Sequence, residues 1–291
     1  MAVDEPHKIR ICHDAEASVG GINLNSLLLG GPNLTNNLAA VLLLFLATKL
    51  IFTTDISGFF HRILVDEDVL DAFRYPFFTD ERMDEIAIKR FLSHIFGSGA
   101  SSLISGFVTR HLADAVKDDF PENVSTTIRK QFYVDDGGGG DDQLDVAVEL
   151  KSNLKKAMLR GGFHLCKWKA NYPGLLEPED YASQPSRVEN KILKILGISW
   201  IPLKDVFCFF MDMKKLKLPA RTPRQLVAVQ SSLFDPCGFV SPFILIGRLI
   251  MQRATHKKRG WDSPLDPQIL KEFFIWASSI PLLANCPIPR W

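Results

Sequence analysis

The pattern of apolar and polar residues along the chain predicts a mixture of strands and helices up to about residue 211 and helices alone after Thr222. Short runs rich in apolar and β-branched residues indicate strands, and apolar residues three or four positions apart indicate helices. The predicted strands lie in KLIFTTDISGFF, FRYPFF, EIAIKRF, IRKQFYV, FHLCKWKAN, ILKILGISWIP and DVFCFFM. The predicted helices cover about 36–47, 98–120, 141–162 and three segments after Thr222, where Thr-Pro is a favoured helix start. This order indicates an α+β fold, with a sheet domain followed by a helical appendage from about 219.

Length and composition are those of a globular protein with two domains or one large one. The chain has 291 residues, 46% of them hydrophobic and 23% charged. The N-terminus has no apolar segment typical of a signal peptide, and the longest apolar run, Leu38 to Ala47, is too short to cross a bilayer. The five cysteines are scattered without a C-x-x-C pair, which argues against a disulfide framework or a zinc site. We therefore expect a protein of a reducing compartment, cytoplasmic rather than secreted and without a membrane partner.

Charge is divided unevenly along the chain, although the formal net charge is only +1. Residues 1–150 hold 12 Lys and Arg against 23 Asp and Glu, whereas residues 151–260 hold 20 against 7. The last 31 residues hold 2 against 3. One interpretation is a basic rear segment that binds a polyanion and an acidic front that gathers carboxylates for cations. The alternative is chance segregation of surface charge.

The stretch QFYVDDGGGGDDQ, residues 131–143, concentrates the candidate chemistry. Asp135 and Asp136 can form half of a catalytic metal site, because phosphoryl transfer by two divalent ions about 4 Å apart needs bridging carboxylates. Other interpretations stay open at this point. Asp-Gly is a common hairpin dipeptide, although the stretch lacks the ligand spacing of a regular calcium loop. It also lacks the G-K-[ST] that a phosphate-binding loop would need.

Asp55 is the natural source of the other half of such a site. It closes an apolar strand and is followed by ISGFFHRI. The distance in sequence between Asp55 and Asp135 is no obstacle, because both strands can lie side by side in one sheet. The sequence therefore predicts that these two aspartates lie on adjacent strands with their carboxylates close enough to share a cation.

These motifs resemble the palm of reverse transcriptases. The resemblance is carried by FYVDD after a strand, TDISGFFHRI upstream and FGSGASS between them. More narrowly, the chain is similar to the retrotransposons of the BEL/Pao group. Further blocks that look like this group are KIRICHDAEASVGGINLNSLLLGGPNL, GGFHLCKWKAN, LGISW, SSLFDPCGFVSP and GWDSPL, which together run through nearly the whole chain. The resemblance implies an RNA-directed DNA polymerase.

The resemblance also implies which residues carry the reaction. Asp55 matches the first catalytic carboxylate of the family, and Asp135 and Asp136 match its Y-x-D-D pair, with Val134 as x. These three aspartates would hold Mg²⁺, with Mn²⁺ as an alternative, for two-metal nucleotidyl transfer from dNTPs.

Further positions match the family's nucleotide-binding residues. Arg10 corresponds to a fingers arginine that grips the triphosphate, and Phe60 to an aromatic gate that excludes a ribose 2′-hydroxyl. Gly97 corresponds to a glycine beneath the incoming nucleotide, where backbone must approach closely. Lys167 corresponds to a lysine near the leaving pyrophosphate. A core phenylalanine and a solvated surface lysine are the alternatives for Phe60 and Lys167.

The family's architecture implies a right-hand polymerase with an antiparallel palm sheet, helices on one face, partial fingers and a helical thumb or connection. Residues 1–52 would form partial fingers and the entry to the palm, 53–200 the palm, and 201–291 the thumb or connection, helical from about 222. The primer grip would lie around Leu196 and Gly197. The partner would be an RNA or DNA template-primer duplex, held by Lys and Arg of the basic segment in a salt-sensitive manner.

The chain departs from the family's pattern after the acidic pair. Gly137 to Gly140 stand where the family has apolar residues, and each glycine weakens a strand by roughly 0.5–1 kcal/mol. The sequence therefore predicts a loose hairpin, which leucines at Gly137 and Gly138 should tighten. Other departures are Ser102, Pro76 and Phe77. The chain is also expected to begin inside the fingers and to end before a ribonuclease H.

Two rival functions follow from these departures. The first is a non-catalytic, nucleic-acid-binding remnant that keeps a basic thumb without a working hairpin, located in the cytoplasm, a virus-like particle or the nucleus. The second is a peptidase centred on Asp235 in FDPCG, although no D-[ST]-G protease signature is present.

Overall fold

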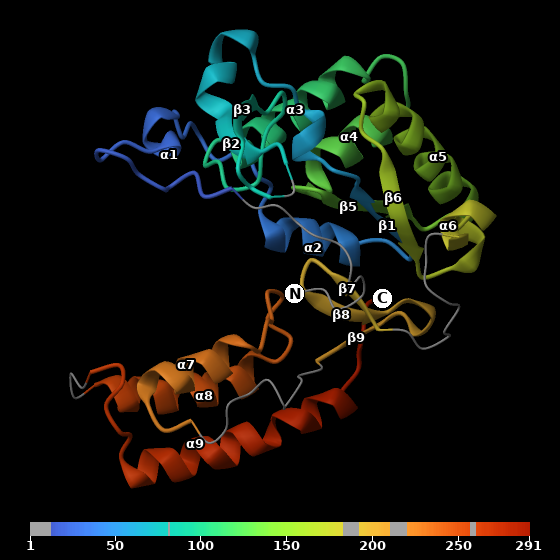
Figure 1. Cartoon of the computed structure of the whole chain (residues 1–291). Helices are drawn as coiled ribbons and strands as arrows, with labels where there is room; N and C mark the ends of the chain where they lie inside the picture. The colour runs from blue at the N-terminus through green and yellow to red at the C-terminus, as the bar shows by residue number, and fades with distance from the viewer. Residues whose placement is uncertain (1–12, 81, 183–191, 210–219, 257–259) are drawn as a thin grey trace. The chain divides into compact units, whose positions relative to one another are not determined.

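The computed structural model describes residues 13–80, 82–182, 192–209, 220–256 and 260–291, and its elements are labelled in Figure 1. The chain divides into two compact units. The first comprises 1–37, 54–139 and 148–168, and the second comprises 38–53, 140–147 and 169–291.

The helices and strands alternate over most of the described residues. The α-helices are α1 (Leu24–Leu27), α2 (Leu38–Leu46), α3 (Ser101–Ala115), α4 (Glu122–Lys130), α5 (Leu144–Arg160), α6 (Pro178–Ala182), α7 (Pro223–Ser231), α8 (Ser241–Thr255) and α9 (Pro267–Ser279). The strands are β1 (Leu50–Ile56), β2 (Arg74–Phe78), β3 (Ile86–Arg90), β4 (Phe132–Tyr133), β5 (Asp136–Asp141), β6 (Leu165–Ala170), β7 (Leu193–Ile195), β8 (Ile198–Ile201), β9 (Val206–Cys208) and β10 (Ile288–Pro289). The 3-10 helices are η1 (Phe60–Arg62), η2 (Glu67–Phe73), η3 (Pro173–Leu175), η4 (Pro202–Lys204) and η5 (Ile280–Asn285).

A four-stranded sheet in the order β4-β5-β1-β6 carries the acidic residues. In β1, Ile51 to Thr54 and Ile56 are buried, as the β-branched apolar run predicts. β4 and β5 pair antiparallel, with Phe132 opposite Gly137 and Tyr133 opposite Asp136. The sheet thus joins the two sequence segments that contain Asp55 and Asp135.

The helices α4 and α5 form because their apolar residues fall on one face. In α4, Val124, Thr127 and Ile128 are buried at helical spacing, and α4 packs on α3. In α5 the buried residues recur at the same spacing; they are Ala147, Leu150, Leu154, Ala157 and Met158. Gly162 ends this region with φ +77°, as the predicted glycine stop requires.

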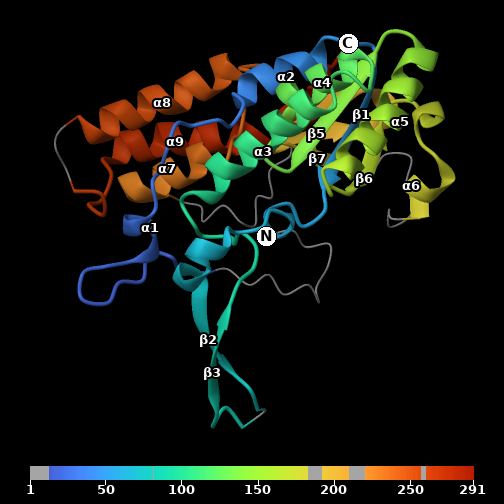
Figure 2. The same cartoon turned by 90° about the horizontal axis from the view of Figure 1, so that it is seen from above.

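The strands β2 and β3 form an extended antiparallel hairpin, as the sequence predicts (Figure 2). Arg74 lies opposite Arg90, and Phe78 opposite Ile86. Phe78 and Ile86 are exposed, so the hairpin buries little of its own surface.

A second sheet in the order β10-β9-β8-β7 belongs to the second unit. Its core joins Phe45 of α2 with Trp200 of β8 and Phe207 of β9. β7 and β8 form a hairpin whose turn residues, Leu196 and Gly197, have φ +47° and φ +88°. A two-residue turn with both φ values positive matches the twist of the strands it connects.

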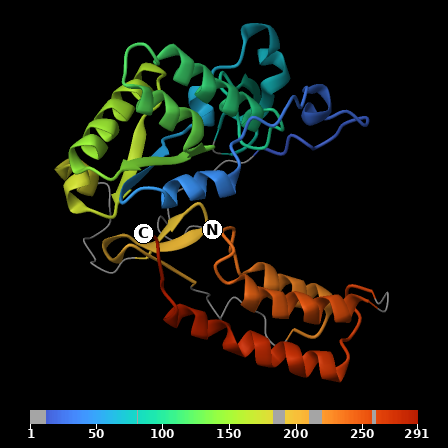
Figure 3. The same ribbon diagram turned by 180° about the vertical axis from the view of Figure 1, so that it is seen from behind.

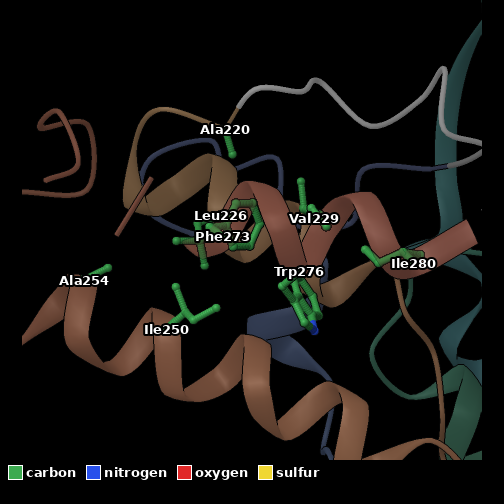
Figure 4. Close-up of a cluster of buried hydrophobic side chains, with 9 residues drawn as sticks. Ala220, Leu226, Val229, Ile250, Ala254, Phe273, Trp276 and Ile280 are labelled. Atoms are coloured by element: carbon green, nitrogen blue, oxygen red, sulfur yellow. The ribbon is translucent and has the colours of Figure 1, made fainter. Parts of the chain in front are cut away.

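The helices α7, α8 and α9 pack together in the second unit (Figure 3). Thr222 caps α7 by accepting a hydrogen bond from Gln225 N, and Pro223 is its first residue, as the sequence predicts. The core between the helices is drawn in Figure 4 and comprises Ala220, Leu226, Val229, Ile250, Ala254, Phe273, Trp276, Ala277 and Ile280. Among the described residues, no helix has both the length and the apolar character that a membrane span requires.

The α+β class is confirmed, but several predicted boundaries are wrong. IRK of the predicted strand IRKQFYV ends helix α4, because its amphipathic spacing continues to Lys130. The predicted helix at 98–120 is confined to Ser101–Ala115. ILKILGISWIP is a hairpin rather than one strand, because Leu196 and Gly197 turn the chain. The last two residues of DVFCFFM, 210 and 211, lie outside the described residues.

Candidate active site

The end of β1 meets the turn that contains the acidic pair. Ile56 N donates a hydrogen bond of 2.8 Å to Asp135 O, so Asp135 lies beside the residue that follows Asp55. Asp135 lies in the turn between β4 and β5, and Asp136 is the exposed first residue of β5. Asp55 and Asp135 therefore lie beside each other, because the strands β1 and β5 are neighbours in the sheet.

The turn that presents the acidic pair is sharp. Val134 has φ +56°, a conformation that β-branched residues rarely adopt and that costs roughly 1–2 kcal/mol. The pairing of Phe132 with Gly137 and of Tyr133 with Asp136 holds the turn on both sides. Local strain of this kind is found at functional sites, where the surrounding structure maintains it.

Lys167 of β6 reaches Asp55 directly. Its Nζ lies 2.9 Å from Asp55 Oδ2, and the side chains of Lys167 and Asp55 are 48% and 24% exposed. The hydrogen bond to Asp55 raises the pKa of Lys167, partial burial acts in the opposite direction, and the carboxylate charges of Asp55 and Asp136 raise it further. Lys167 is therefore a charged partner of the candidate catalytic carboxylate.

Cys166 is a neighbour of the site that the sequence analysis missed. Its Sγ lies 3.4 Å from Asp55 O and 3.7 Å from Asp55 Oδ1. In a regular strand, Cys166 and Lys167 would point to opposite faces. Lys167 has φ +55°, which breaks that alternation and lets both side chains reach Asp55. Strand periodicity alone gives no signal for this arrangement.

The donor atoms of the three aspartates suit a hard divalent cation, because Asp55, Asp135 and Asp136 offer only carboxylate oxygens. Within the described ranges, however, no group of three or more His, Cys, Asp and Glu side chains is arranged to hold a metal ion. At Asp55 Oδ2 the ammonium of Lys167 is in contact. A divalent cation at the same oxygen would repel this ammonium, so the two cations would compete for Asp55.

Phe60 lies in η1, five residues after Asp55. Its ring stacks on buried Phe59, with centroids 6.0 Å apart, and meets the ring of Phe96 edge-on at 5.0 Å. Phe59, not Phe60, is the core phenylalanine of GFF. The half-buried Phe60 ring is thus fixed on two sides, which a steric gate requires.

Only a glycine fits at position 97, because of its backbone conformation and the backbone of His13 beside it. It has φ +103°, and a Cβ at this position would lie 2.0 Å from His13 O. His13 N also donates a hydrogen bond to Phe96 O at 3.3 Å. The close approach at Gly97 in this structure is that of the His13 backbone, and the role of Gly97 beneath a nucleotide stays a prediction.

The remaining predicted residues are not brought to the acidic cluster by the described contacts. Arg10 lies outside the described residues. Leu196 and Gly197 form the β7–β8 turn of the second unit, where a Cβ on Gly197 would lie 2.7 Å from the ring of Phe234. Their role as a primer grip stays a prediction.

The predicted looseness of the glycine segment is not what the structure shows. Gly137 to Gly140 lie within β5, and a Cβ on Gly137 would lie 2.3 Å from two ring atoms of buried Phe132. A Cβ on Gly140 would lie 2.2 Å from Leu50 O. Gly137 and Gly140 are close-packing positions, so the expectation that leucines at Gly137 and Gly138 would tighten the hairpin is wrong at Gly137.

Comparison with known proteins gives two results. Residues 222–291 match a family model described as the Pao retrotransposon-like RNaseH-like domain. Two solved structures of a foamy viral protease-reverse transcriptase, one in complex with RNA/DNA hybrid and one with ds DNA, match 88% of this chain with TM-scores of 0.51 and 0.52. Sequence identity to them is 12% and 14%, so the likeness concerns the fold. No curated protein matches.

The match to the Pao family model concerns residues 222–291, and the likeness to the foamy viral structures concerns the fold. The description of that segment as RNaseH-like differs from the thumb or connection that the sequence predicts. Its described residues form α7, α8, α9, η5 and the two-residue strand β10. The chain spans 30% and 39% of the two foamy viral chains, well under half of their length.

Proposed function

We propose that this chain is the RNA-directed DNA polymerase segment of a retroelement polyprotein, which extends a primer by nucleotidyl transfer from dNTPs. The observation that carries the proposal is the 2.8 Å hydrogen bond from Ile56 N to Asp135 O, because it joins the strand end at Asp55 to the Y-x-D-D turn. Two carboxylates presented from neighbouring strands are the donor set that phosphoryl transfer with divalent cations needs.

The proposed roles follow from the positions of the side chains. Asp55 and Asp135, with Asp136, would hold Mg²⁺ or Mn²⁺, and such ions when bound stabilise the charge that develops on the transferred phosphoryl group. Phe60, fixed by Phe59 and Phe96, would exclude a 2′-hydroxyl. Lys167 would contact the anionic leaving group once it has left Asp55. The expected partner is a template-primer duplex, as in the foamy viral complexes, which contain an RNA/DNA hybrid or ds DNA.

The second candidate is a non-catalytic nucleic-acid-binding remnant. The observation that favours it is the contact of Lys167 with Asp55, together with the lack of a three-ligand group in the part of the chain that the structure describes. The paired glycine strand β5 speaks against the remnant, because the hairpin is in register and packed.

A peptidase centred on Asp235 is not supported. Its two carboxylate oxygens accept hydrogen bonds from Phe239 N and Val240 N, at 2.9 and 2.8 Å, just before α8 begins. Asp235 thus supports the entry to a helix.

Primer extension on poly(rA)/oligo(dT) separates the two candidates. The polymerase proposal predicts incorporation of dTTP with Mg²⁺ or Mn²⁺ that is lost in Asp135→Ala, while both proteins bind the template-primer equally. Binding without incorporation by the parent chain, under either metal, would favour the remnant.

A further inference from the structure

The contact between Lys167 and Asp55 has the properties of an exchangeable pair. It joins a lysine side chain that is 48% exposed to an aspartate side chain that is 24% exposed, through a distance of 2.9 Å between Lys167 Nζ and Asp55 Oδ2. Ion pairs that solvent can reach contribute little net stability, so separating them costs little. A divalent cation has twice the charge of the ammonium and therefore competes for the same carboxylate.

The backbone on both sides of Lys167 allows the side chain to move alone. Trp168, the next residue, is buried, and its ring receives the ammonium of Lys151 at 4.8 Å from the centroid. On the other side Cys166 Sγ contacts Asp55 O. The strand is thus anchored next to Lys167, whose own side chain is about half exposed.

We propose that Lys167 is an exchangeable internal cation of the site: it occupies Asp55 until a divalent cation displaces it, so that metal binding and release of the ammonium are coupled. The identity of the cation rests on the proposed function. The exchange itself is a property of Asp55 and Lys167, and it can be measured without nucleotide, primer or template. In this account, metal binding is what makes Lys167 available to an anionic substrate.

Mn²⁺ binding, followed by the electron paramagnetic resonance of the free ion, tests the exchange in the full chain. Lys167→Met removes the competing cation, and we expect it to bind Mn²⁺ about three- to tenfold more tightly than the parent. Lys167→Arg keeps a cation and should bind like the parent. The matched control is Lys156→Met, which removes the same charge from an exposed position on α5 and should also bind like the parent.

The gain must also depend on Asp55. In an Asp55→Asn background, Lys167→Met should give no gain in affinity, because the shared carboxylate is gone. The inference is overturned if Lys167→Met binds Mn²⁺ no more tightly than Lys156→Met, or if neither binds it. Circular dichroism checks folding, and Lys167→Gln replaces Lys167→Met with the same expectation if the methionine variant unfolds.

A direct readout is the resonance of Lys167 after reductive methylation with a ¹³C label, assigned by its loss in Lys167→Arg. Mg²⁺ should shift this signal and leave that of Lys156 in place. Metal binding without a shift at Lys167 contradicts the exchange. A chain that shows the exchange but extends no primer refutes the proposed polymerase and leaves this inference standing. A chain that extends the primer without the exchange refutes this inference and supports the polymerase.

Discussion

Two pairs of an aspartate and a basic residue, one in each unit, show how burial decides the role of the same chemistry. Arg290 has a side chain that is 0% exposed, and its Nε and Nη2 bind both oxygens of Asp205 at 2.7 and 2.8 Å. Lys167 makes one contact of 2.9 Å to Asp55 and is 48% exposed. The side chains of Asp205 and Asp55 are similarly exposed, at 23% and 24%, so the two pairs differ in the basic partner. Arg290 is buried and binds both carboxylate oxygens, whereas Lys167 is half exposed and makes a single contact.

Asp205 and Arg290 also make further hydrogen bonds to their surroundings. The remaining N–H groups of Arg290 donate to main-chain carbonyls of Phe45, Thr48 and Lys49, at the end of α2 and in the loop that leads to β1. Asp205 also accepts hydrogen bonds from the side chains of Trp200 and Asn171; these contacts are 3.1 Å each. A buried pair that is fully hydrogen-bonded is costly to break, because removing one partner leaves the other charge unpaired.

The largest expected effect is therefore that of Arg290→Met. This change removes the charged partner of Asp205 and the guanidinium that binds three main-chain carbonyls, and we expect a loss of about 3–5 kcal/mol in the free energy of unfolding of the second unit. Urea denaturation followed by tryptophan fluorescence measures it, since Trp200 bonds to Asp205.

The matched control is Arg224→Met, because Arg224 bonds Asp262 with two nitrogens at the surface, where both side chains are more than half exposed. We expect little change in stability there. If Arg290→Met were no more harmful than Arg224→Met, burial would not distinguish the two kinds of pair.

The contrast between the two pairs also marks what the sequence can predict. The proximity of Asp55 and Asp135 was predictable from the sequence, because each aspartate follows an apolar run and the two together match a motif. The Arg290–Asp205 pair was not, since its partners lie 85 residues apart and the carbonyls more than 240 residues away. Nothing in the local sequence around Arg290 signals a bidentate, buried partner.

The local spacing of apolar residues explains which helices were predicted correctly from the sequence and which were missed. Helix α5 was predicted because acids in its first turn, apolar spacing and Gly161-Gly162 all agree. Helix α4 was missed, although Val124, Thr127 and Ile128 carry helical spacing, because its apolar and β-branched end runs into FYV and resembles a strand. The packing role of Gly137 depends on the ring of Phe132, which only the paired hairpin places against it.

The second prediction concerns that glycine. Gly137→Ala places a Cβ within 2.3 Å of the Phe132 ring, and overpacking of this kind costs about 1–3 kcal/mol. We expect a less stable hairpin and weaker primer extension, measured by thermal unfolding and dTTP incorporation. Adding Phe132→Leu should make the combined loss smaller than the sum of the single losses.

Gly30→Ala is the control for this prediction, because a Cβ there meets no atom within 4 Å. It should change stability by no more than about 0.5 kcal/mol. An increase in extension on replacing Gly137, as the loose-hairpin hypothesis requires, would contradict the packing role of this glycine.

A smaller effect on stability than that of Arg290→Met or Gly137→Ala should come from replacing a third aspartate, Asp235. Its two hydrogen bonds to Phe239 N and Val240 N support the start of α8, so Asp235→Ala should cost about 1 kcal/mol. Primer extension per folded molecule should be unchanged. Loss of extension in a fully folded Asp235→Ala protein would show that this carboxylate is not merely structural.

The most direct test of the central claim, that Asp55 is an accessible functional carboxylate, is primer extension by Asp55→Asn at a matched folded fraction. The substitution keeps the shape of the side chain and removes only a solvent-accessible ion pair, so unfolding should move by less than about 1 kcal/mol. We predict that extension falls at least about 100-fold, as loss of a group that stabilises transition-state charge requires. A folded Asp55→Asn protein that extends the primer within about twofold of the parent rate would contradict this assignment of Asp55.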